Sequence, residues 1–257
     1  MDPPPSQQNV PTPQSAHTSP LHDEDCAFCQ IITAYPIVSP LESSQTLSEA
    51  LNPEKLHPPA FVLLSTEHVV AFLDIFPLVR GHVLLCPRRH AEKVGDMTSR
   101  EGMEIGRILP LISRAVVRAT MPDIPHAEVD YNIVQNNGPG AAQVVPHTHF
   151  HIVPRYPFES TYTPYTTPKR KPPPQGIQAT AILFGRGQRH YRDDDDAEGL
   201  IKVMRKEVAE EWRREFGGGN VSVSDRSDAV EEGQSGRTSG SSEAQQEGAG
   251  ASSATRI

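Results

Sequence analysis

The stretch "HTHFHIV" at residues 147–153 places a histidine at every second position. Successive side chains of a β-strand point to opposite faces, so His147, His149 and His151 would share one face and the residues between them the other. A helix would turn each histidine by about 200° from the previous one and spread the three rings around its circumference. The spacing therefore predicts a strand that presents three imidazoles on a single face.

Composition limits the folded part of the chain to one region. The sequence has 257 residues; it begins with Pro, Ser and Gln at residues 1–22 and closes with Gly, Ser and acidic residues at 217–257. Neither end carries enough apolar side chains to offset the entropy lost on ordering, so we expect two disordered tails. One folded region, between residues 23 and 216, remains.

Charge, hydropathy and cysteine content narrow the classes of function. The 32 acidic and 24 basic residues give a net charge of −8, which does not favour broad binding to nucleic acid. No stretch approaches the roughly 18 apolar residues of a membrane span, and the N-terminus has no apolar signal segment. Three cysteines do not predict a disulfide framework. We expect a soluble protein of the cytoplasm or nucleus that binds neither nucleic acid nor membrane.

Hydrophobic runs separated by turn residues predict five strands. Val, Leu and Phe cluster at residues 61–64, 68–73 and 82–86, and a fourth run lies at about 129–135. The histidine segment is the fifth strand, ended by Pro154. The short connections between the first strands favour antiparallel pairing.

Two helices are expected. Thr98 and Glu101 form a capping-box pair ahead of apolar residues that recur at spacings of three and four up to Ala119. Pro110 lacks a backbone donor and would clash with the preceding turn, so we expect a kink or a break there. Apolar residues four apart predict a second amphipathic helix at 194–216.

Three segments have no clear periodicity. Residues 33–59 look like an insertion or a long loop, and residues 156–178 look like a surface loop. The basic run at 169–171 within that loop is either a solvated cluster or a phosphate contact. The acidic run at 193–196 is either the start of the late helix or a metal-binding cluster.

The element order predicts an α+β fold. It consists of a largely antiparallel five-stranded sheet, a central amphipathic helix and an additional C-terminal helix. Domain boundaries follow from the same pattern: a domain at 23–156 that contains the 33–59 insertion, and an extension at 157–216 with a long loop and a helix.

The histidine face has three possible roles: ligation of zinc by His-x-His, nucleophilic or general-base catalysis, or a structural polar patch. The preceding turn "NNGPGAAQ" at 136–143 adds a second feature. Gly138 and Gly140 let main-chain N–H groups approach an anion, which would suit a phosphate, although a plain tight turn between strands explains them equally well.

These residues resemble a known motif. "QNNGPGAA" followed by "QVVPHTHFHIVPR" is similar to the signature of the histidine triad family, in its nucleotide-binding branch. The segments "CAFCQII", "VVAFLDI" and "RGHVLLCPRRH" match the same family in the same order. The resemblance covers residues 26–155, with 33–59 as an insertion.

The resemblance implies a catalytic mechanism. In this family the central histidine attacks the α-phosphorus of a nucleotide and forms a covalent nucleotidyl-imidazole that water cleaves. His149 matches that position, His151 matches the third histidine beside the phosphate or leaving group, and His147 matches the first. A neutral imidazole is a competent nucleophile at pH 7.

The resemblance also implies a nucleotide site. Asp74 would hold the ribose hydroxyls and Ile75 would pack on the base. The groups around the α-phosphate and at the pocket edge would be Asn136, Gln143, Ala142, Val144 and His82. Val144 departs from the pattern, because phosphoramidases of the family often carry a hydroxyl there; His151 or water would then have to protonate the leaving group.

Cys26 and Cys29 supply half of a tetrahedral zinc site. Some relatives complete such a site with a histidine after a basic pair and with the first triad histidine, positions matched by His90 and His147. The alternative is two unliganded thiols. Cys86 lies in an apolar run and is expected in the core.

The function that the resemblance implies is cleavage of purine nucleoside 5′-phosphoramidates, which are AMP conjugates, with structural Zn²⁺ and no organic cofactor. The resemblance also implies a homodimer. One alternative is hydrolysis of dinucleoside polyphosphates. Another, of a different class, is a nucleotide-binding or scaffold protein without catalysis.

Overall fold

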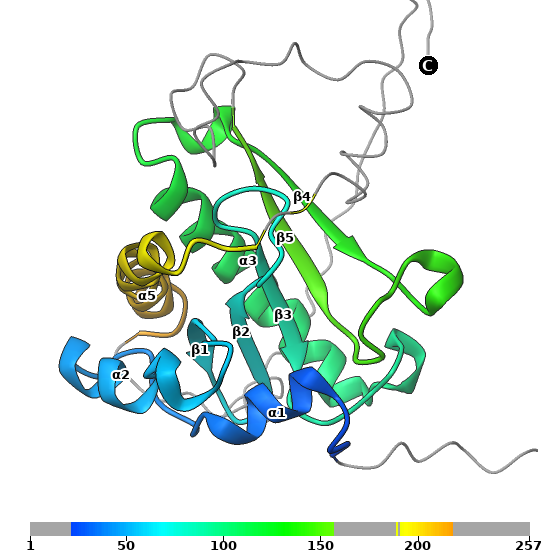
Figure 1. Ribbon diagram of the computed structural model, residues 1–257. Helices are drawn as coiled ribbons and strands as arrows, with labels where there is room; N and C mark the ends of the chain where they lie inside the picture. The colour runs from blue at the N-terminus through cyan, green and yellow to red at the C-terminus, as the bar shows by residue number, and fades with distance from the viewer. Residues whose placement is uncertain (1–21, 157–188, 190, 218–257) are drawn as a thin grey trace, which may run out of the picture. The chain divides into compact units, whose positions relative to one another are not determined.

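A five-stranded antiparallel sheet forms the centre of the structure, a computed structural model that describes residues 22–156, 189 and 191–217 (Figure 1). The strands lie in the order β1-β2-β3-β5-β4, and every neighbouring pair is antiparallel. Their bounds are β1 Val62–Ser65, β2 Val69–Leu73, β3 Val83–Pro87, β4 Asp130–Gln135 and β5 Phe150–Arg155. The predicted α+β fold and its largely antiparallel sheet are confirmed. The predicted tails, almost all of the 156–178 loop and its basic run lie outside the described residues.

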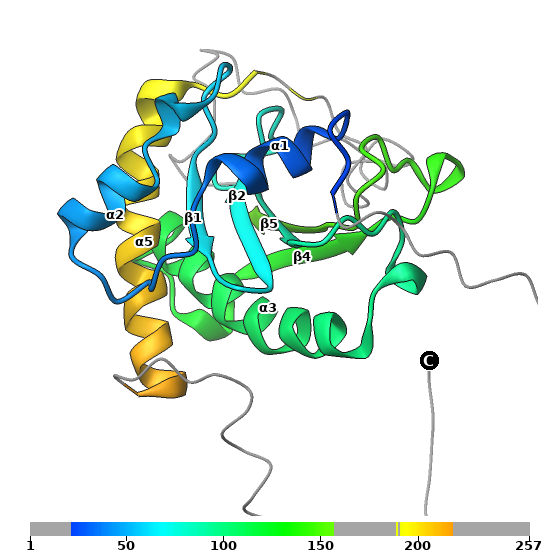
Figure 2. The same ribbon diagram turned by 90° about the horizontal axis from the view of Figure 1, so that it is seen from below.

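Helices cover both faces of this sheet. Figure 2 shows α1 on one side of the sheet and α3 on the other, with α5 beside the β1 edge. Their bounds are α1 Ala27–Ala34, α2 Ser44–Ala50, α3 Ser99–Thr120 and α5 Asp194–Phe216, and short 3-10 turns lie at Pro53–Lys55, Val94–Asp96, His126–Glu128 and Pro139–Ala141. No helix in the described part of the chain is long and apolar enough to cross a bilayer.

The alternation of side chains along the strands produces two apolar cores. In β2, Val69, Ala71 and Leu73 pack with residues of α3 and α5, whereas Val70 and Phe72 pack with residues of α1 and α2. Fully burying a side chain of this size stabilises a fold by about 1.5–3 kcal/mol. Strand β2 is therefore buried on both faces, and any polar group in this part of the sheet needs a specific partner.

Helix α3 begins as the sequence predicts. The Thr98 hydroxyl accepts a hydrogen bond from the Glu101 N–H at 3.3 Å, and the Glu101 carboxylate accepts one from the Thr98 N–H at 2.7 Å. Of the kink or break expected at Pro110, the break is wrong, because the helix continues to Thr120. Pro110 is exposed, and the buried side chains of Ile108 and Leu111 on either side of it hold the helix against the sheet.

The segment 33–59 is not simply a loop. It contains α2, whose cap is Ser43, with a side chain that accepts a hydrogen bond from the Thr46 N–H. Leu47 and Leu51 from this region are buried in the second core. Leu47 is the one buried residue of α2 and Leu51 is its C-cap residue, so this seven-residue helix gives no detectable period in the sequence.

Strand β5 also extends beyond the predicted end. Pro154 lies within it, opposite Tyr131 of β4. The ladder with β3 ends at Ile152, opposite Val83, so no β3 acceptor requires the N–H that proline lacks. A proline is tolerated there for this reason.

Helix α5 has the bounds that the sequence predicts, and Arg205 ties it to the sheet. The Arg205 guanidinium donates to the Val62 carbonyl at 2.7 Å and to the Leu51 carbonyl at 2.9 Å. Burial lowers the pKa of Arg205 to about 10. The acidic run becomes the helix start, since the Asp193 carboxylate accepts from the N–H groups of Asp195 and Asp196.

Replacing Arg205 with methionine should destabilise the protein by about 2–4 kcal/mol, because two buried carbonyls lose their donor. The measurement is the free energy of unfolding in urea. Arg213→Met, which removes an exposed arginine from the same helix, is the matched control and should cost less than about 0.5 kcal/mol. Equal effects of the two variants would contradict this role for Arg205.

Candidate active site

The three histidines do lie together, but only His151 belongs to the strand. The ladders of β5 begin at Phe150, which pairs with Leu85 and Gln135. Upstream, the Thr148 N–H donates to the Ala91 carbonyl at 2.6 Å instead of to a strand. The predicted strand over 147–153 is therefore wrong for its first three residues, because their backbone bonds go to a loop.

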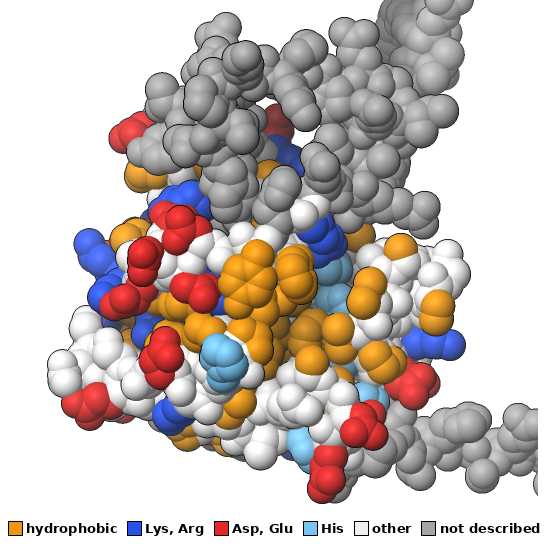
Figure 3. Space-filling view, in the orientation of Figure 1, with side chains coloured by type: hydrophobic (Ala, Val, Ile, Leu, Met, Phe, Trp, Pro, Cys, Tyr) orange, Lys and Arg blue, Asp and Glu red, His pale blue; other side chains and the backbone are white. Residues whose placement is uncertain are grey.

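His149 is held in one orientation by the backbone. Its Nδ1 lies 2.6 Å from the His147 carbonyl oxygen, which can only accept, so Nδ1 carries the proton and Nε2 keeps its lone pair. Burial lowers the pKa of His149 from its ordinary value, and the ring is 5 % exposed. Figure 3 shows separate patches of histidine surface beside hydrophobic side chains on one face of the molecule. A neutral, oriented imidazole with a free Nε2 is suited to nucleophilic attack.

A second histidine pair lies beside it. The ring centroids of His149 and His151 are 4.7 Å apart, and His151 Nδ1 lies 2.9 Å from His82 Nε2. The Leu78 N–H donates to His82 Nδ1 at 3.2 Å, which leaves the His82 proton on Nε2, facing His151. Burial lowers the pKa of His151 to about 3. Both rings are thus neutral and share one hydrogen bond.

The Asp74 carboxylate lies beside the His82–His151 pair without a hydrogen bond to it, because His82 Nδ1 accepts from the Leu78 N–H. Its Oδ2 lies 3.3 Å from His82 Nδ1, and its charge partly counters the lowered pKa of His151. The Asp74 carboxylate also accepts from the Phe76 N–H at 2.9 Å and from the Arg189 guanidinium at 2.9 Å. Ile75 follows it and is half-buried. The charge of Asp74 can therefore help to stabilise a proton that enters at His151.

The glycine-rich turn is held by its own side chains. Gly138 has φ = 83°, a backbone conformation that favours glycine, and its N–H donates to Gln143 Oε1 at 2.6 Å. Gln143 Nε2 donates in turn to the Glu92 carbonyl at 2.7 Å. The side chain of Gln143 thus holds two loops together, and Asn136 lies half-buried at the start of the turn.

The predicted backbone donors differ in availability. The Ala142 N–H already donates to the Pro139 carbonyl at 2.9 Å, and Ala142 is left-handed with φ = 65°. Among the described residues no acceptor takes the Val144 N–H, and the Val144 side chain is 90 % exposed. Of the two, only Val144 offers an open N–H to an anion.

A group of four buried metal-ligating side chains lies next to the histidine segment: Cys26, Cys29, His90 and His147. Their ligand atoms all lie within 4.8 Å of one another. The Sγ–Nδ1 distances are 3.4 Å for Cys29–His90, 3.5 Å for Cys26–His147 and 3.6 Å for Cys29–His147. Tetrahedral zinc with Zn–S of about 2.3 Å and Zn–N of about 2.0 Å would separate sulfur and nitrogen by about 3.5 Å. Donor type, number and spacing therefore fit a structural zinc ion.

The second ring nitrogen of His147 also has a hydrogen-bond partner. His147 Nε2 lies 2.9 Å from the Pro87 carbonyl, so Nε2 carries the proton and Nδ1 faces the two thiols. Burial lowers the pKa of His147 to about 4, which favours the neutral ring that a metal binds. His147 therefore faces the cysteines with its ring and orients His149 with its carbonyl. Cys86 is buried in the core as predicted.

Four residues near the site were not predicted. Phe28 of α1 meets the ring of His149 edge to face with centroids 5.0 Å apart, and Phe76 pairs with Tyr191 at 5.7 Å. Arg189 reaches Asp74 across 115 positions of sequence. A single aromatic residue or arginine carries no periodic signal, so only the tertiary structure reveals these contacts.

Known proteins are similar to this chain in sequence and in fold. The family model described as the HIT domain matches residues 55–158. An uncharacterized HIT-like protein of Methanocaldococcus jannaschii is 42% identical over 99 residues, which are 38% of this chain and 70% of that protein. This protein belongs to the HIT family.

Two further proteins are similar to this chain. The adenosine 5′-monophosphoramidase of Schizosaccharomyces pombe is 39% identical over 97 residues, which are 38% of this chain and 65% of that enzyme. The crystal structure of a hypothetical histidine triad nucleotide-binding protein from Sulfolobus tokodaii aligns with a TM-score of 0.50 and 22% identity, covering 75% of this chain and 97% of that one. The likeness to that structure supports the HIT fold and extends no further.

Proposed function

We propose that this protein cleaves purine nucleoside 5′-phosphoramidates through a covalent nucleotidyl intermediate on His149. The observation that carries the proposal is the hydrogen bond from His149 Nδ1 to the His147 carbonyl, which leaves Nε2 with a lone pair in a buried, neutral ring. The phosphoramidase name of the Schizosaccharomyces relative supports the same substrate class.

The reaction has two displacement steps. In the first, His149 Nε2 attacks the α-phosphorus, an Nε2–P bond forms, and the P–N bond to the leaving amine breaks. In the second, water attacks the same phosphorus, the Nε2–P bond breaks, AMP leaves, and the proton that water loses returns to His151. The amine needs a proton as it departs, and His151 with water is the nearest source, since no hydroxyl side chain stands at position 144. The open Val144 N–H would stabilise charge on the phosphoryl oxygens.

Asp74 would bind the ribose hydroxyls in this scheme. An ionised carboxylate only accepts hydrogen bonds, and ribose offers two adjacent O–H donors. Ile75 would pack on the base beside it, and His82 would hold the His151 ring through the hydrogen bond from His82 Nε2 to His151 Nδ1. Asn136 would contact the α-phosphate, while Gln143 would act through the turn that it holds.

Zinc would be held by Cys26, Cys29, His90 and His147. When bound, it would supply structural cross-linking of α1 to the histidine segment and no reaction chemistry, because four protein ligands leave no open position. The hydrogen bond to the Pro87 carbonyl already orients the His147 ring, and bound zinc would hold the ring in the same orientation.

The residue at position 144 favours a second candidate substrate class. A polyphosphate leaving group departs as an anion and needs no proton, whereas an amine does. Val144 lacks the hydroxyl that would supply one. Dinucleoside polyphosphates are therefore the alternative substrate class, and the ratio of turnover on diadenosine tetraphosphate to turnover on an AMP phosphoramidate decides between the two.

The test of the mechanism is to incubate the protein with a panel of AMP conjugates, quench early and digest. Mass spectrometry should find adenylylation at His149 in a peptide that spans 147–155. Turnover without any label there, or a label on another residue, would overturn the covalent role of His149. AMP binding without turnover of any conjugate would favour the non-catalytic alternative.

Homodimerisation stays a proposal as well. Strand β4 is the edge of the sheet, and its Tyr131 and Ile133 are 36 % and 44 % exposed. An edge strand with exposed apolar side chains suits pairing with a second copy. Light scattering coupled to size exclusion should give twice the chain mass, and Ile133→Lys should reduce it to the monomer.

A further inference from the structure

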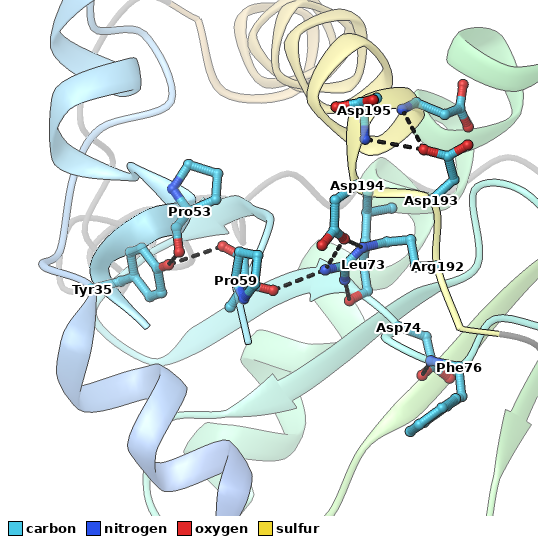
Figure 4. A network of polar contacts seen from close by, with 12 residues as sticks. Tyr35, Pro53, Pro59, Leu73, Asp74, Phe76, Arg192, Asp193, Asp194 and Asp195 are labelled. Carbon is cyan, nitrogen blue, oxygen red and sulfur yellow. Dashed lines mark hydrogen bonds and ion pairs between the residues drawn. The ribbon is translucent and has the colours of Figure 1, made fainter. Parts of the chain in front are cut away.

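The segment that enters α5 lies along the loop 74–76. The Arg192 N–H donates to the Ile75 carbonyl at 2.9 Å, and the Arg192 guanidinium donates to the carbonyls of Leu73 at 3.4 Å and Pro59 at 2.8 Å (Figure 4). Arg192 is 7 % exposed and stacks over the Phe61 ring at 4.4 Å. This part of the chain is thus fixed beside the loop that carries Asp74.

Two further contacts fix the segment to the same loop. The rings of Phe76 and Tyr191 meet edge to face with centroids 5.7 Å apart. The Arg189 guanidinium donates to Asp74 Oδ2 at 2.9 Å and to the Phe76 carbonyl at 3.0 Å. A residue far along the chain therefore reaches the carboxylate at which the ribose would bind.

Asp74 has little acceptor capacity left. A carboxylate offers about four acceptor positions. The Phe76 N–H occupies one on Oδ1 and Arg189 occupies one on Oδ2, while the His82 ring packs at 3.3 Å from Oδ2. One position on each oxygen remains, but the one on Oδ2 lies between the guanidinium and the His82 ring, so a ribose hydroxyl that binds Oδ2 meets Arg189 there.

The charge of Arg189 also affects histidines deeper in the site. It contributes to the lowered pKa values of His82, His149 and His151, after the larger effect of burial. The guanidinium is therefore close enough to the three rings to influence them. The Arg189 side chain is 34 % exposed, so it can move into solvent without breaking the core.

We propose that Arg189 sets the nucleoside affinity of the site by competing with the ribose hydroxyls for the Asp74 carboxylate. The inference rests on the proposed function, in which Asp74 binds ribose. It assigns Arg189, which precedes α5, a direct part in ligand selection: ribose hydroxyls bind Asp74 only when they replace the guanidinium there.

The test compares three ligands with the full chain and its Arg189→Gln variant by titration calorimetry. Adenosine and AMP carry both hydroxyls, and 2′,3′-dideoxyadenosine carries neither. We expect Arg189→Gln to lower the Kd of adenosine and of AMP by about two- to fivefold, the range for a partly exposed ion pair. The Kd of 2′,3′-dideoxyadenosine should not change.

Arg213→Gln is the matched control, because it removes one exposed positive charge at the far end of α5 and should leave every Kd unchanged. Unchanged or weaker adenosine binding by Arg189→Gln would overturn the inference, and so would weaker binding of AMP alone, which would mark a phosphate contact. If AMP binds and Asp74→Asn weakens it while Arg189→Gln has no effect, the nucleotide site stands and only the competition fails. If no nucleotide binds either protein, both proposals fail.

Discussion

Replacing His149 with asparagine should lower kcat on an AMP phosphoramidate by about 10⁴-fold, because the variant has no imidazole to form the phosphorus bond. AMP binding should stay within about threefold of the wild type, since the proposed ribose and base contacts lie on another loop. Steady-state kinetics and calorimetric titration with AMP check the two halves of this expectation.

His126 provides the control for this experiment. It is exposed in the 3-10 turn before β4, away from the histidine segment, and His126→Asn should retain full kcat. A kcat of the His149→Asn variant within about tenfold of the wild type would show that His149 is not the nucleophile. Loss of AMP binding together with kcat would instead indicate a structural role for the ring.

Replacing Cys29 with alanine should remove bound zinc and destabilise the fold by about 3 kcal/mol or more, because a metal that binds only the folded state contributes its binding energy to stability. The purified wild type should contain one zinc per chain by elemental analysis. Its unfolding temperature should fall when a strong chelator is added. Cys29 is fully buried, and without a metal burial raises its thiol pKa to about 11.

Cys86→Ala is the control that separates the effect of losing zinc from the effect of losing side-chain packing. Cys86 is equally buried, and its thiol faces the Val70 carbonyl rather than the cluster. We expect this variant to keep its zinc and to lose about 1 kcal/mol for the smaller side chain. A wild type that purifies without zinc in zinc-supplemented medium, or equal destabilisation by both variants, would rule out the structural site.

The strands and the two long helices could be predicted because their signals are periodic. Four apolar runs and the capping box at Thr98 are local features that the tertiary structure did not override. Helix α1 was missed because its cap, Cys26, offers no side-chain hydrogen bond. Pro110 was misjudged because the sequence does not reveal how strongly the neighbouring apolar residues are buried.

The candidate site likewise contains residues that the sequence could predict and residues that it could not. The motif brought the three histidines, Asp74 and the four possible zinc ligands to attention, and the structure brings each group together. The start of β5 was misplaced because the bond from Thr148 to Ala91 joins residues far apart in sequence. Arg189 could not be predicted either, because the distance between it and Asp74 along the chain hides their contact.

Helix α5 has a consequence for synthesis. Arg205 bonds to Val62 across 143 positions, and Met204, Val208 and Trp212 fill the core under β1. A nascent chain at the ribosome can therefore pair its strands early but cannot close that core until α5 has emerged. Until then the apolar residues that α5 covers, beside those already covered by α3, are open to chaperones or to aggregation. A truncation before Asp194 would make that transient state permanent.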